Sequence, residues 1–342
     1  MSARCSAVAE PMLHVLAWVA IALAVANVLG VATLIYQRVR IRRRDTRRDE
    51  LEAHVTPLAL ALLDGKEPGE LDAGAQLALV DVLSRYSRLV RGAPREHIAA
   101  YFAGSAAYQR ALHDLSARKR WRRTAAAFTL GDMAVPAATP ELRRALHDRD
   151  REVRAAAARS LGKLQDVDAV EELTEALASA TVPRLVAARA LLEIGEPALV
   201  ELLALLDRPD AAVRATASEL VGLLGSARDA PLLIEHLSDP SAAVREQAAI
   251  ALGRLGAGAA TSALISALDD RVGFVRAAAA GALGAIGDAT AKPVLLEVAR
   301  SDSFEAAHAA AYAVLALDPE AAARSAGSVH VDEIADVARV RG

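Results

Sequence analysis

The stretch DPSAAVREQAAIALGRLG, residues 239–256, decides the fold. An Asp-Pro-Ser turn opens it, and the apolar side chains from Val244 to Leu252 then recur at helical spacing along one face. Proline favours the start of a helix, and the Ser241 hydroxyl is expected to cap its free amide groups. Gly256 ends the pattern. The stretch therefore predicts one amphipathic helix between a polar turn and a glycine turn.

Arg245 in this stretch belongs to a series that repeats every 30 or 31 residues. The other members are Arg123, Arg154, Arg184, Arg214 and Arg276. Between successive members lies a second apolar helical pattern, such as Leu264, Ile265 and Leu268. A unit of this length cannot bury its apolar faces alone, so the units are expected to stack on one another. The repeat predicts an all-α array of helical hairpins.

Three aspartates share the pitch of the arginines. Asp148, Asp239 and Asp270 stand six residues before Arg154, Arg245 and Arg276. One interpretation is a solvated carboxylate at a helix N-terminus beside a surface arginine, where the pair adds about 0 to 1 kcal/mol. The other is a contact between neighbouring units. Recurrence at the repeat pitch favours the second interpretation.

Composition narrows the class of protein. The 342 residues are 54% hydrophobic but only 3% aromatic, which suits a core of closely packed aliphatic helices. Cys5 is the single cysteine, so an internal disulfide and a cysteine-rich zinc site are excluded. Residues 1–50 hold eight arginines and four acids, whereas residues 51–342 hold 32 basic and 39 acidic residues. An acidic repeat region argues against binding of nucleic acid.

Residues 12–36, MLHVLAWVAIALAVANVLGVATLIY, form an apolar segment without Asp, Glu, Lys or Arg. As a helix it would extend about 37 Å, which exceeds a hydrocarbon core of about 30 Å. The alternative is a cleaved signal peptide ending near Ala26, but the apolar run continues for ten residues beyond that site. We therefore expect a retained transmembrane helix after a short extracytoplasmic tail, residues 1–11.

An arginine cluster in residues 37–50 sets the expected orientation. Only Arg4 precedes the span, and seven arginines follow it: Arg38, Arg40, Arg42, Arg43, Arg44, Arg47 and Arg48. Positive residues stay in the cytoplasm, so the N-terminus is expected outside and the repeats in the cytoplasm, on a single-pass protein of the cell membrane. Within the span, small residues and one amide form a stripe that could contact a partner helix: Ala22, Ala26, Asn27 and Gly30.

The remaining chain divides into a cap, the array and a tail. Residues 51–118 lack the repeat signature and are predicted as a divergent helical N-terminal cap, which must shield the first repeat on one side. Its apolar stripe consists of Leu79, Leu83, Tyr86 and Val90, and Val82 and Leu89 are expected to widen it on one side. The repeat array is assigned to residues 119–328, followed by a C-terminal tail or cap, residues 329–342.

The repeated residues resemble the short HEAT repeat, in the bacterial form also found in phycobilisome lyases. The features are Asp239-Pro240, Val244-Arg245, Leu252-Gly253 and Leu255-Gly256. The resemblance covers about residues 120–300 and weakens at 178–195, where Pro183 and Leu192 replace the Val and Gly. It implies a right-handed α-solenoid of HEAT-like helical hairpins, preceded here by one transmembrane helix. The layout is similar to bacterial membrane-anchored HEAT proteins whose genes often neighbour a membrane glycosyltransferase.

The sequence offers no constellation for catalysis. Some HEAT-like hydroxylases carry His-Glu pairs as iron ligands, but no His-Glu dipeptide occurs here, and only His113 and His147 precede an acid. Nothing beyond the scaffold residues suggests a tetrapyrrole site like that of the lyases, and no phosphate-binding glycine motif appears. We therefore predict no metal, no cofactor and no enzyme activity. A HEAT-type hydroxylase or bilin lyase stays as the alternative, and a nucleic-acid-binding helical repeat ranks below it.

These observations together predict a membrane-anchored interaction scaffold. Its concave helical surface is expected to dock a protein partner, for example a membrane enzyme such as a glycosyltransferase. Tethering to the bilayer would raise the local concentration of the scaffold near such a partner.

Overall fold

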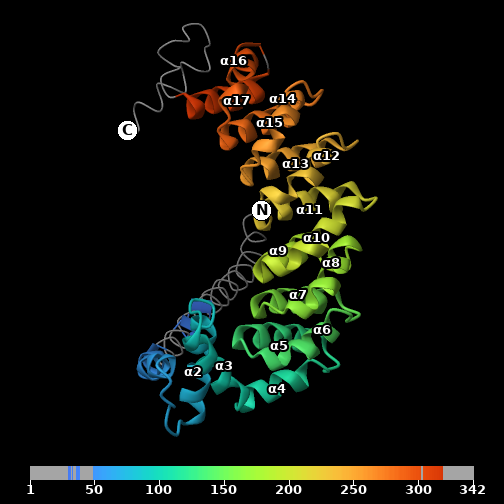
Figure 1. Ribbon diagram of the computed structural model, residues 1–342. Coiled ribbons are helices and arrows are strands. Elements are labelled where there is room, and N and C mark those ends of the chain that lie inside the picture. Colours follow the sequence, from blue (N-terminus) through green and yellow to red (C-terminus); the bar gives the residue numbers. More distant parts are fainter. Residues whose placement is uncertain (1–29, 32, 34–35, 39–48, 302, 319–342) are drawn as a thin grey trace, which may run out of the picture. The chain divides into compact units, whose positions relative to one another are not determined.

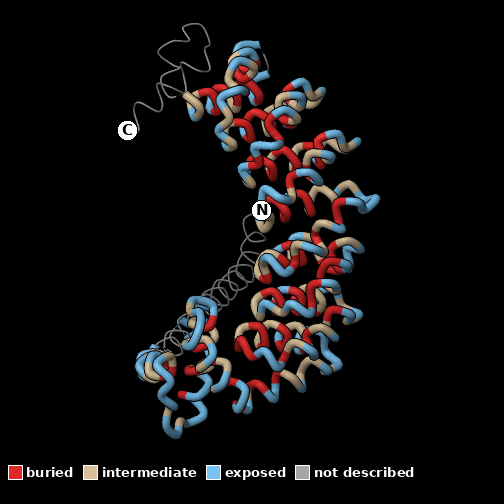
Figure 2. Tube along the Cα trace, viewed as in Figure 1, coloured by how far each residue is buried: buried red, intermediate tan, exposed pale blue. Residues whose placement is uncertain are grey.

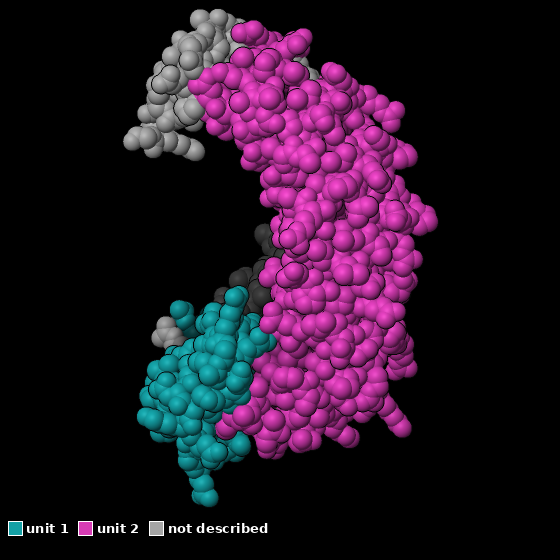
Figure 3. Space-filling view, in the orientation of Figure 1, with its two compact units in different colours: residues 1–98 teal, residues 99–342 magenta. Residues whose placement is uncertain are grey.

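A computed structural model describes residues 30–31, 33, 36–38, 49–301 and 303–318. These residues contain α-helices, short 3₁₀ turns and loops, and no strand. They divide into two compact units, residues 1–98 and 99–342, with the division inside helix α3 (Ala93–Ala103) (Figure 3). The all-α helical repeat fold expected from the sequence is confirmed.

The first unit holds a helix at 49–63, then α2 (Ala73–Tyr86) and the start of α3. Its core includes Leu79, Val82 and Leu83, as the apolar stripe predicts. The prediction that Leu89 widens this stripe is wrong, because α2 ends at Tyr86 and leaves Leu89 in a turn with 78% of its surface exposed.

The second unit is the repeat array, and its longer helices form one layer (Figure 1). After α4 (Ala106–Asp114), the long helices are α5 (Arg120–Met133), α7 (Arg151–Leu164), α9 (Arg184–Ile194), α11 (Ala211–Leu224), α13 (Ala242–Arg254), α15 (Gly273–Ile286) and α17 (Phe304–Leu317). Successive long helices pack against each other. We call their solvent-exposed side the long-helix surface.

Shorter helices form the second layer, and each packs against the long helix that follows it. They are α6 (Thr139–Ala145), α8 (Val170–Ala178), α10 (Leu199–Ala204), α12 (Ala230–His236), α14 (Thr261–Ala267) and α16 (Lys292–Ser301). A 3₁₀ turn leads into each: η1 (Pro136–Ala138), η2 (Val167–Ala169), η3 (Glu196–Ala198), η5 (Ala227–Asp229), η6 (Gly258–Ala260) and η7 (Ala289–Ala291), with η4 (Leu205–Asp207) after α10.

The core of the array is aliphatic and lies between the two layers, where buried residues alternate with exposed ones along every helix (Figure 2). Each unit contributes the same types of side chain: Val244, Ala248 and Leu252 of a long helix are fully buried, and so is Leu264 of a short helix. This aliphatic filling matches the low aromatic content of the sequence. The short apolar faces of neighbouring hairpins are buried by one another, as a solenoid requires.

The predicted membrane span lies largely outside the described residues. Of residues 12–36, the structure describes Gly30, Val31, Thr33 and Tyr36, all helical, while Ala22, Ala26 and Asn27 lie outside it. Arg38 is described, and the other arginines of the cluster and the tail at 329–342 are not. None of the helices in the described part of the chain combines the length and the apolar composition needed to cross a bilayer.

Candidate functional site

The repeated arginine lies in the first turn of a long helix and joins two units. Arg245 donates from Nη1 to the carbonyl oxygen of Asp239, at 2.8 Å, within its own turn. Its Nε and Nη2 donate to the two carboxylate oxygens of Asp270 in the next turn, at 2.6 and 2.9 Å. A planar guanidinium matches a carboxylate in this two-pronged way. Arg245 therefore holds its own turn closed and fixes the next turn to it.

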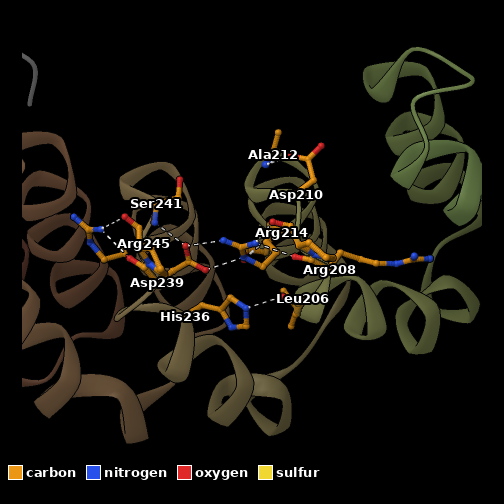
Figure 4. Close-up of polar contacts among 12 residues, drawn as sticks. Leu206, Arg208, Asp210, Ala212, Arg214, His236, Asp239, Ser241 and Arg245 are labelled. Atoms are coloured by element: carbon orange, nitrogen blue, oxygen red, sulfur yellow. Dashed lines mark hydrogen bonds and ion pairs between the residues drawn. The ribbon is translucent and has the colours of Figure 1, made fainter.

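The same fork links two other pairs of turns. Arg123 bonds Asp148 at 2.8 and 2.9 Å, and Arg214 bonds Asp239 at the same two distances (Figure 4). In every case the partner carboxylate lies 25 residues after the arginine, in the following unit. The aspartate six residues before an arginine contributes its carbonyl oxygen instead, as Asp239 does for Arg245.

Each of these aspartates also organises its own turn. The Asp239 carboxylate accepts a hydrogen bond from the backbone N–H of Ser241 at 2.7 Å, and Asp148 and Asp270 do the same two residues on. The expectation that Ser241 caps the helix is wrong, because its hydroxyl makes no capping hydrogen bond. The Asp239 carboxylate binds the N–H of Ser241 itself, just before α13 begins at Ala242.

The arginine forks lower the pKa of the aspartates. For Asp270 the hydrogen bond from Arg245 is the largest influence and holds the pKa below its ordinary value against the opposing effect of burial. Burial is the largest influence on Asp148 and Asp239 and alone would raise their pKa. Hydrogen bonds from Arg123 or Arg214 and from the backbone outweigh it, so the pKa of both is also lowered. All three carboxylates are therefore ionised at neutral pH.

Two other members of the arginine series, Arg154 and Arg184, make different contacts. Arg154 donates from Nε to the carbonyl oxygen of Thr181 at 2.9 Å, because Ser179 stands where the other turns have aspartate. Arg184 pairs with Asp210 through a single nitrogen, on a more exposed site. Arg276 bonds the Asp270 carbonyl at 2.8 Å and lies 3.5 Å from the Ser303 hydroxyl. The two-pronged link thus weakens in the middle of the array.

Glycine brings successive long helices into close contact. A Cβ built on Gly253 would lie 2.7 Å from the Ala282 Cα, and one on Gly222 would lie 2.6 Å from the Ala251 Cα. Gly131, Gly162 and Gly284 face Ser160, Ala190 and Ala313 in the same way. No side chain fits at such distances, so the repeated Leu-Gly pair specifies how tightly the units stack.

This close contact is missing between α9 and α11. Leu192 occupies the glycine position of α9, and these two helices approach each other less closely along their length than the other successive long helices. α9 is also three residues shorter than α11, as its bounds show. We call this place the α9–α11 joint. It coincides with the singly bonded Arg184, so two stabilising features of the array are reduced together.

The long-helix surface carries the exposed aromatic side chains of the described array. They are Trp121 on α5, Phe274 on α15, and Phe304 and Tyr312 on α17. On α17 the ring of His308 lies between the last two, 5.4 Å from the Phe304 ring and 4.9 Å from that of Tyr312. Aromatic side chains are enriched where proteins meet their partners.

The array also has an open apolar pocket of about 280 Å³. Its lining comes from α13 and α15: Ile250, Gly253, Arg254, Ala278, Gly281, Ala282 and Ala285. Gly281 leaves its floor bare, because nothing lies within 4 Å of where its Cβ would be. These small side chains leave a hollow that a side chain of another protein can enter. The sequence pattern did not predict this surface, because alanine and glycine recur throughout the repeats as packing and turn residues.

No group of three or more metal-ligating side chains occurs among the residues that the structure describes. His113 and His147, the two histidines followed by an acid, are exposed. His236 binds the Leu206 carbonyl of the preceding unit through Nε2, at 2.9 Å, and so contributes to stacking (Figure 4).

Residues 109–191 and 230–316 match the family described as HEAT repeats. No curated protein matches the sequence. Among solved structures, Escherichia coli YibA is 22% identical over 77% of this chain and 96% of its own, with a TM-score of 0.44. Human deoxyhypusine hydroxylase is 22% identical, with coverages of 79% and 98% and a TM-score of 0.33. The CpcE–CpcF complex of phycocyanin lyase from Nostoc sp. PCC7120 is 24% identical, with coverages of 76% and 94% and a TM-score of 0.30.

The family match covers both ends of the array and omits residues 192–229, which include Leu192 and α11. Arginine forks, glycine contacts and paired helices repeat in the matched parts at the pitch of the sequence. On this evidence the chain belongs to the HEAT-repeat proteins.

Proposed function

We propose that the chain is a protein-interaction scaffold, held at the cytoplasmic side of the cell membrane by residues 12–36. Its long-helix surface binds a protein partner. The observation that supports this function is the exposure of aromatic side chains on α15 and α17, where Phe304 is 65% and Tyr312 51% exposed. Exposure of such rings to water is unfavourable in the free protein, and their burial in a complex is favourable.

The pattern of rigid and exposed parts supports the same function. Arginine forks and glycine contacts hold the backbone of α13 and α15, so the Ile250–Ala285 pocket is formed before a partner arrives. A preformed surface loses less conformational entropy on binding than a flexible one. A preformed surface of this kind is suited to holding another protein in place.

The membrane part of the proposal comes from the sequence. The 25 apolar residues at 12–36 are long enough to span a bilayer, and the seven arginines that follow favour a cytoplasmic array. The resemblance to membrane-anchored HEAT proteins suggests a membrane enzyme as partner, with a glycosyltransferase as the first candidate. The small-residue stripe with Asn27 would give the span itself a face for a partner helix.

Site-specific photocrosslinking in cells tests the binding surface. A photoreactive phenylalanine analogue at Ile250 or Tyr312 on the long-helix surface should yield a discrete crosslinked product. The same analogue at Val200 or Leu232, exposed on the short-helix layer, provides the matched control. Equal products from both layers, or products only from the control sites, would overturn the assignment of the surface. Mass spectrometry of the product identifies the partner and shows whether it is a glycosyltransferase.

Fractionation tests the anchor separately. The full chain should stay with membranes in alkaline carbonate, and a variant lacking residues 12–36 should be released. A wild-type chain that is released by carbonate would refute the anchor without affecting the scaffold assignment. An activity that appears when iron or a bilin is added to the purified protein would instead favour the enzyme alternative.

A further inference from the structure

A cationic patch with an exposed tryptophan opens the array. It consists of the consecutive residues Arg118, Lys119, Arg120, Trp121 and Arg122, in the turn before α5 and in its first helical turn. We call it the Arg-Trp patch. Arg123, the next residue, points inward to Asp148 and is buried, so it belongs to the stacking network instead.

The patch has more positive charge than its neighbours neutralise. Arg122 pairs with Asp114 at 2.6 Å, and Arg120 lies 3.9 Å from Asp150. Arg118 and Lys119 are exposed, and neither forms an ion pair with any described residue. The turn that packs beside the patch adds exposed Arg149 and Arg151 on either side of Asp150.

Later turns of the array do not share this charge. The corresponding segments before Arg245 and Arg276 are residues 240–244, which carry no charge, and residues 271–275, which carry one arginine. Stacking therefore does not require the cations of the Arg-Trp patch, because units without them pack in the same way.

The contacts of Trp121 within the fold do not explain why a tryptophan occupies this position. Its side chain is 64% exposed, and its indole N–H donates to no described group. The equivalent position, two residues before the repeated arginine, holds another aromatic residue only in Phe274; in the other units it holds Glu152, Val182, Ala212 and Ala243. A large ring in water amid cations suits the headgroup zone of a membrane, where the apolar body of tryptophan is buried and its N–H stays hydrated.

A pocket of about 350 Å³ lies within the patch. His113, Asp114, Ala117, Arg118, Lys119, Trp121 and Arg122 line it. Three of these side chains carry permanent positive charge, so the pocket suits a phosphate-bearing group of small size. The indole and the cations line the same pocket, so one ligand could place an apolar part against Trp121 and an anionic part against the cations.

We propose that the Arg-Trp patch docks on an anionic lipid bilayer, with its cations at lipid phosphates and the Trp121 indole in the headgroup zone. A bilayer fits better than a nucleic acid, because a long polyanion would run from the patch along an array that is acidic on balance. Single-stranded nucleic acid also needs successive stacking platforms. The next exposed aromatic side chain of the described array is Phe274, five long helices further on.

This contact is additional to the proposed N-terminal anchor and does not depend on it. Anionic lipids are concentrated in the cytoplasmic leaflet, and each lysine or arginine near such a surface strengthens binding about fivefold. Loss of the two unpaired cations should therefore weaken the contact by roughly 25-fold, and loss of all four by more. A second contact would restrict how the array stands on the membrane.

Trp121 itself reports on the contact in the full chain. The sequence has two tryptophans, so Trp18→Phe leaves Trp121 as the sole one. This protein is incorporated into vesicles of phosphatidylcholine, with or without 30 mol% phosphatidylserine, made with ordinary or brominated acyl chains. Brominated lipid quenches an indole that enters the bilayer. We expect the anionic brominated vesicles to reduce Trp121 emission by at least half, and neutral ones to have little effect.

Two charge variants in the Trp18→Phe background distinguish an effect of the Arg-Trp patch from an effect of the total charge of the protein. Arg118→Gln, Lys119→Gln, Arg120→Gln and Arg122→Gln together should abolish the quenching. The matched control removes four exposed arginines elsewhere, Arg228, Arg254, Arg271 and Arg300, and should keep it. Circular dichroism confirms that both variants fold. Salt at 0.5 M, where the Debye length is roughly 4 Å, should weaken the quenching of the parent protein.

Several outcomes would overturn the patch proposal. If the protein stays on anionic vesicles but its Trp121 emission is not quenched, the patch proposal fails and the anchor stands. Equal quenching in neutral vesicles, or quenching that survives the patch variant, shows that the cations do not bring the indole to lipid. Tight binding of a labelled oligonucleotide without lipid quenching assigns the patch to nucleic acid instead. If the protein floats with neither kind of vesicle, both this proposal and the anchor fail.

Discussion

Arg245 and Asp270 form a nearly buried two-pronged ion pair between consecutive units, with only 7% and 12% of their side chains exposed. Removal of one member leaves the other charge without its partner in a site that water barely reaches. The chain has an exposed arginine on the same helix, Arg254, that makes no ion pair with a described residue. The two residues allow the effect of the pair to be separated from the effect of charge.

Arg245→Ala should lower the free energy of unfolding by about 3 kcal/mol. Because the link joins α13 to the turn before α15, the urea transition should also broaden as the units unfold less cooperatively. Urea melts followed by circular dichroism measure both effects. Arg254→Ala should change the free energy by less than about 0.5 kcal/mol, and equal melts for the two variants would show that the fork does not stabilise the array.

The lowered pKa of Asp270 predicts a specific loss of stability in acid. A folded-state pKa below the ordinary value of 3.8 stabilises the fold above about pH 4, and this contribution disappears as the pH falls through the folded pKa. Asp270→Asn should therefore be less stable at neutral pH but lose less on acidification. Urea midpoints between pH 7 and pH 2.5 test this, with the exposed neighbour in Asp269→Asn as control. Parallel curves for the two variants would be incompatible with the prediction.

Two glycines one helix apart should respond to alanine in opposite directions. In Gly253→Ala the new methyl group meets the Ala282 backbone at 2.7 Å, so overpacking should cost about 1 to 3 kcal/mol. In Gly281→Ala it meets open space on a helix and should stabilise the fold by about 0.5 to 1 kcal/mol. Thermal and urea melts of both variants decide the sign. Stabilisation by both substitutions would mean that the long helices can move apart freely.

The α9–α11 joint should open more readily than the rest of the array. It lacks the glycine contact, and Arg184 holds Asp210 through one nitrogen only. We expect amide hydrogens of α9 and α10 to exchange at least tenfold faster than those of α13 and α14 under native conditions. Hydrogen–deuterium exchange with mass spectrometry compares the two segments within one sample. Uniform protection along the array would rule out a weaker joint.

Much of the fold follows from the sequence because the pitch of Arg123 to Arg276 already implies stacked hairpins. The partner of each arginine was harder to assign, since the aspartate six residues earlier and the one 25 residues later both recur at that pitch. Only the folded turn shows that the first offers its carbonyl oxygen and the second its carboxylate.

Burial at helix ends was predicted less well. Leu89 continues the apolar spacing of α2, but the helix stops at Tyr86 and the spacing no longer places the side chain on the same face. The long-helix surface could not be foreseen either, because Trp121 and Phe274 share a repeat position that is not aromatic in the other units, and Tyr312 stands at a different position. Their common exposure depends on how separate hairpins align, which a single helix pattern does not contain.

The leucine at position 192 divides the array into two blocks, each held internally by glycine contacts. The affinity of a partner that binds only one block does not depend on the angle between the two blocks. A partner that bridges both must select or impose that angle, and its affinity then depends on the balance of angles in the free protein. Substitution of Leu192 could thus tune recognition of bridging partners from a position that no partner touches.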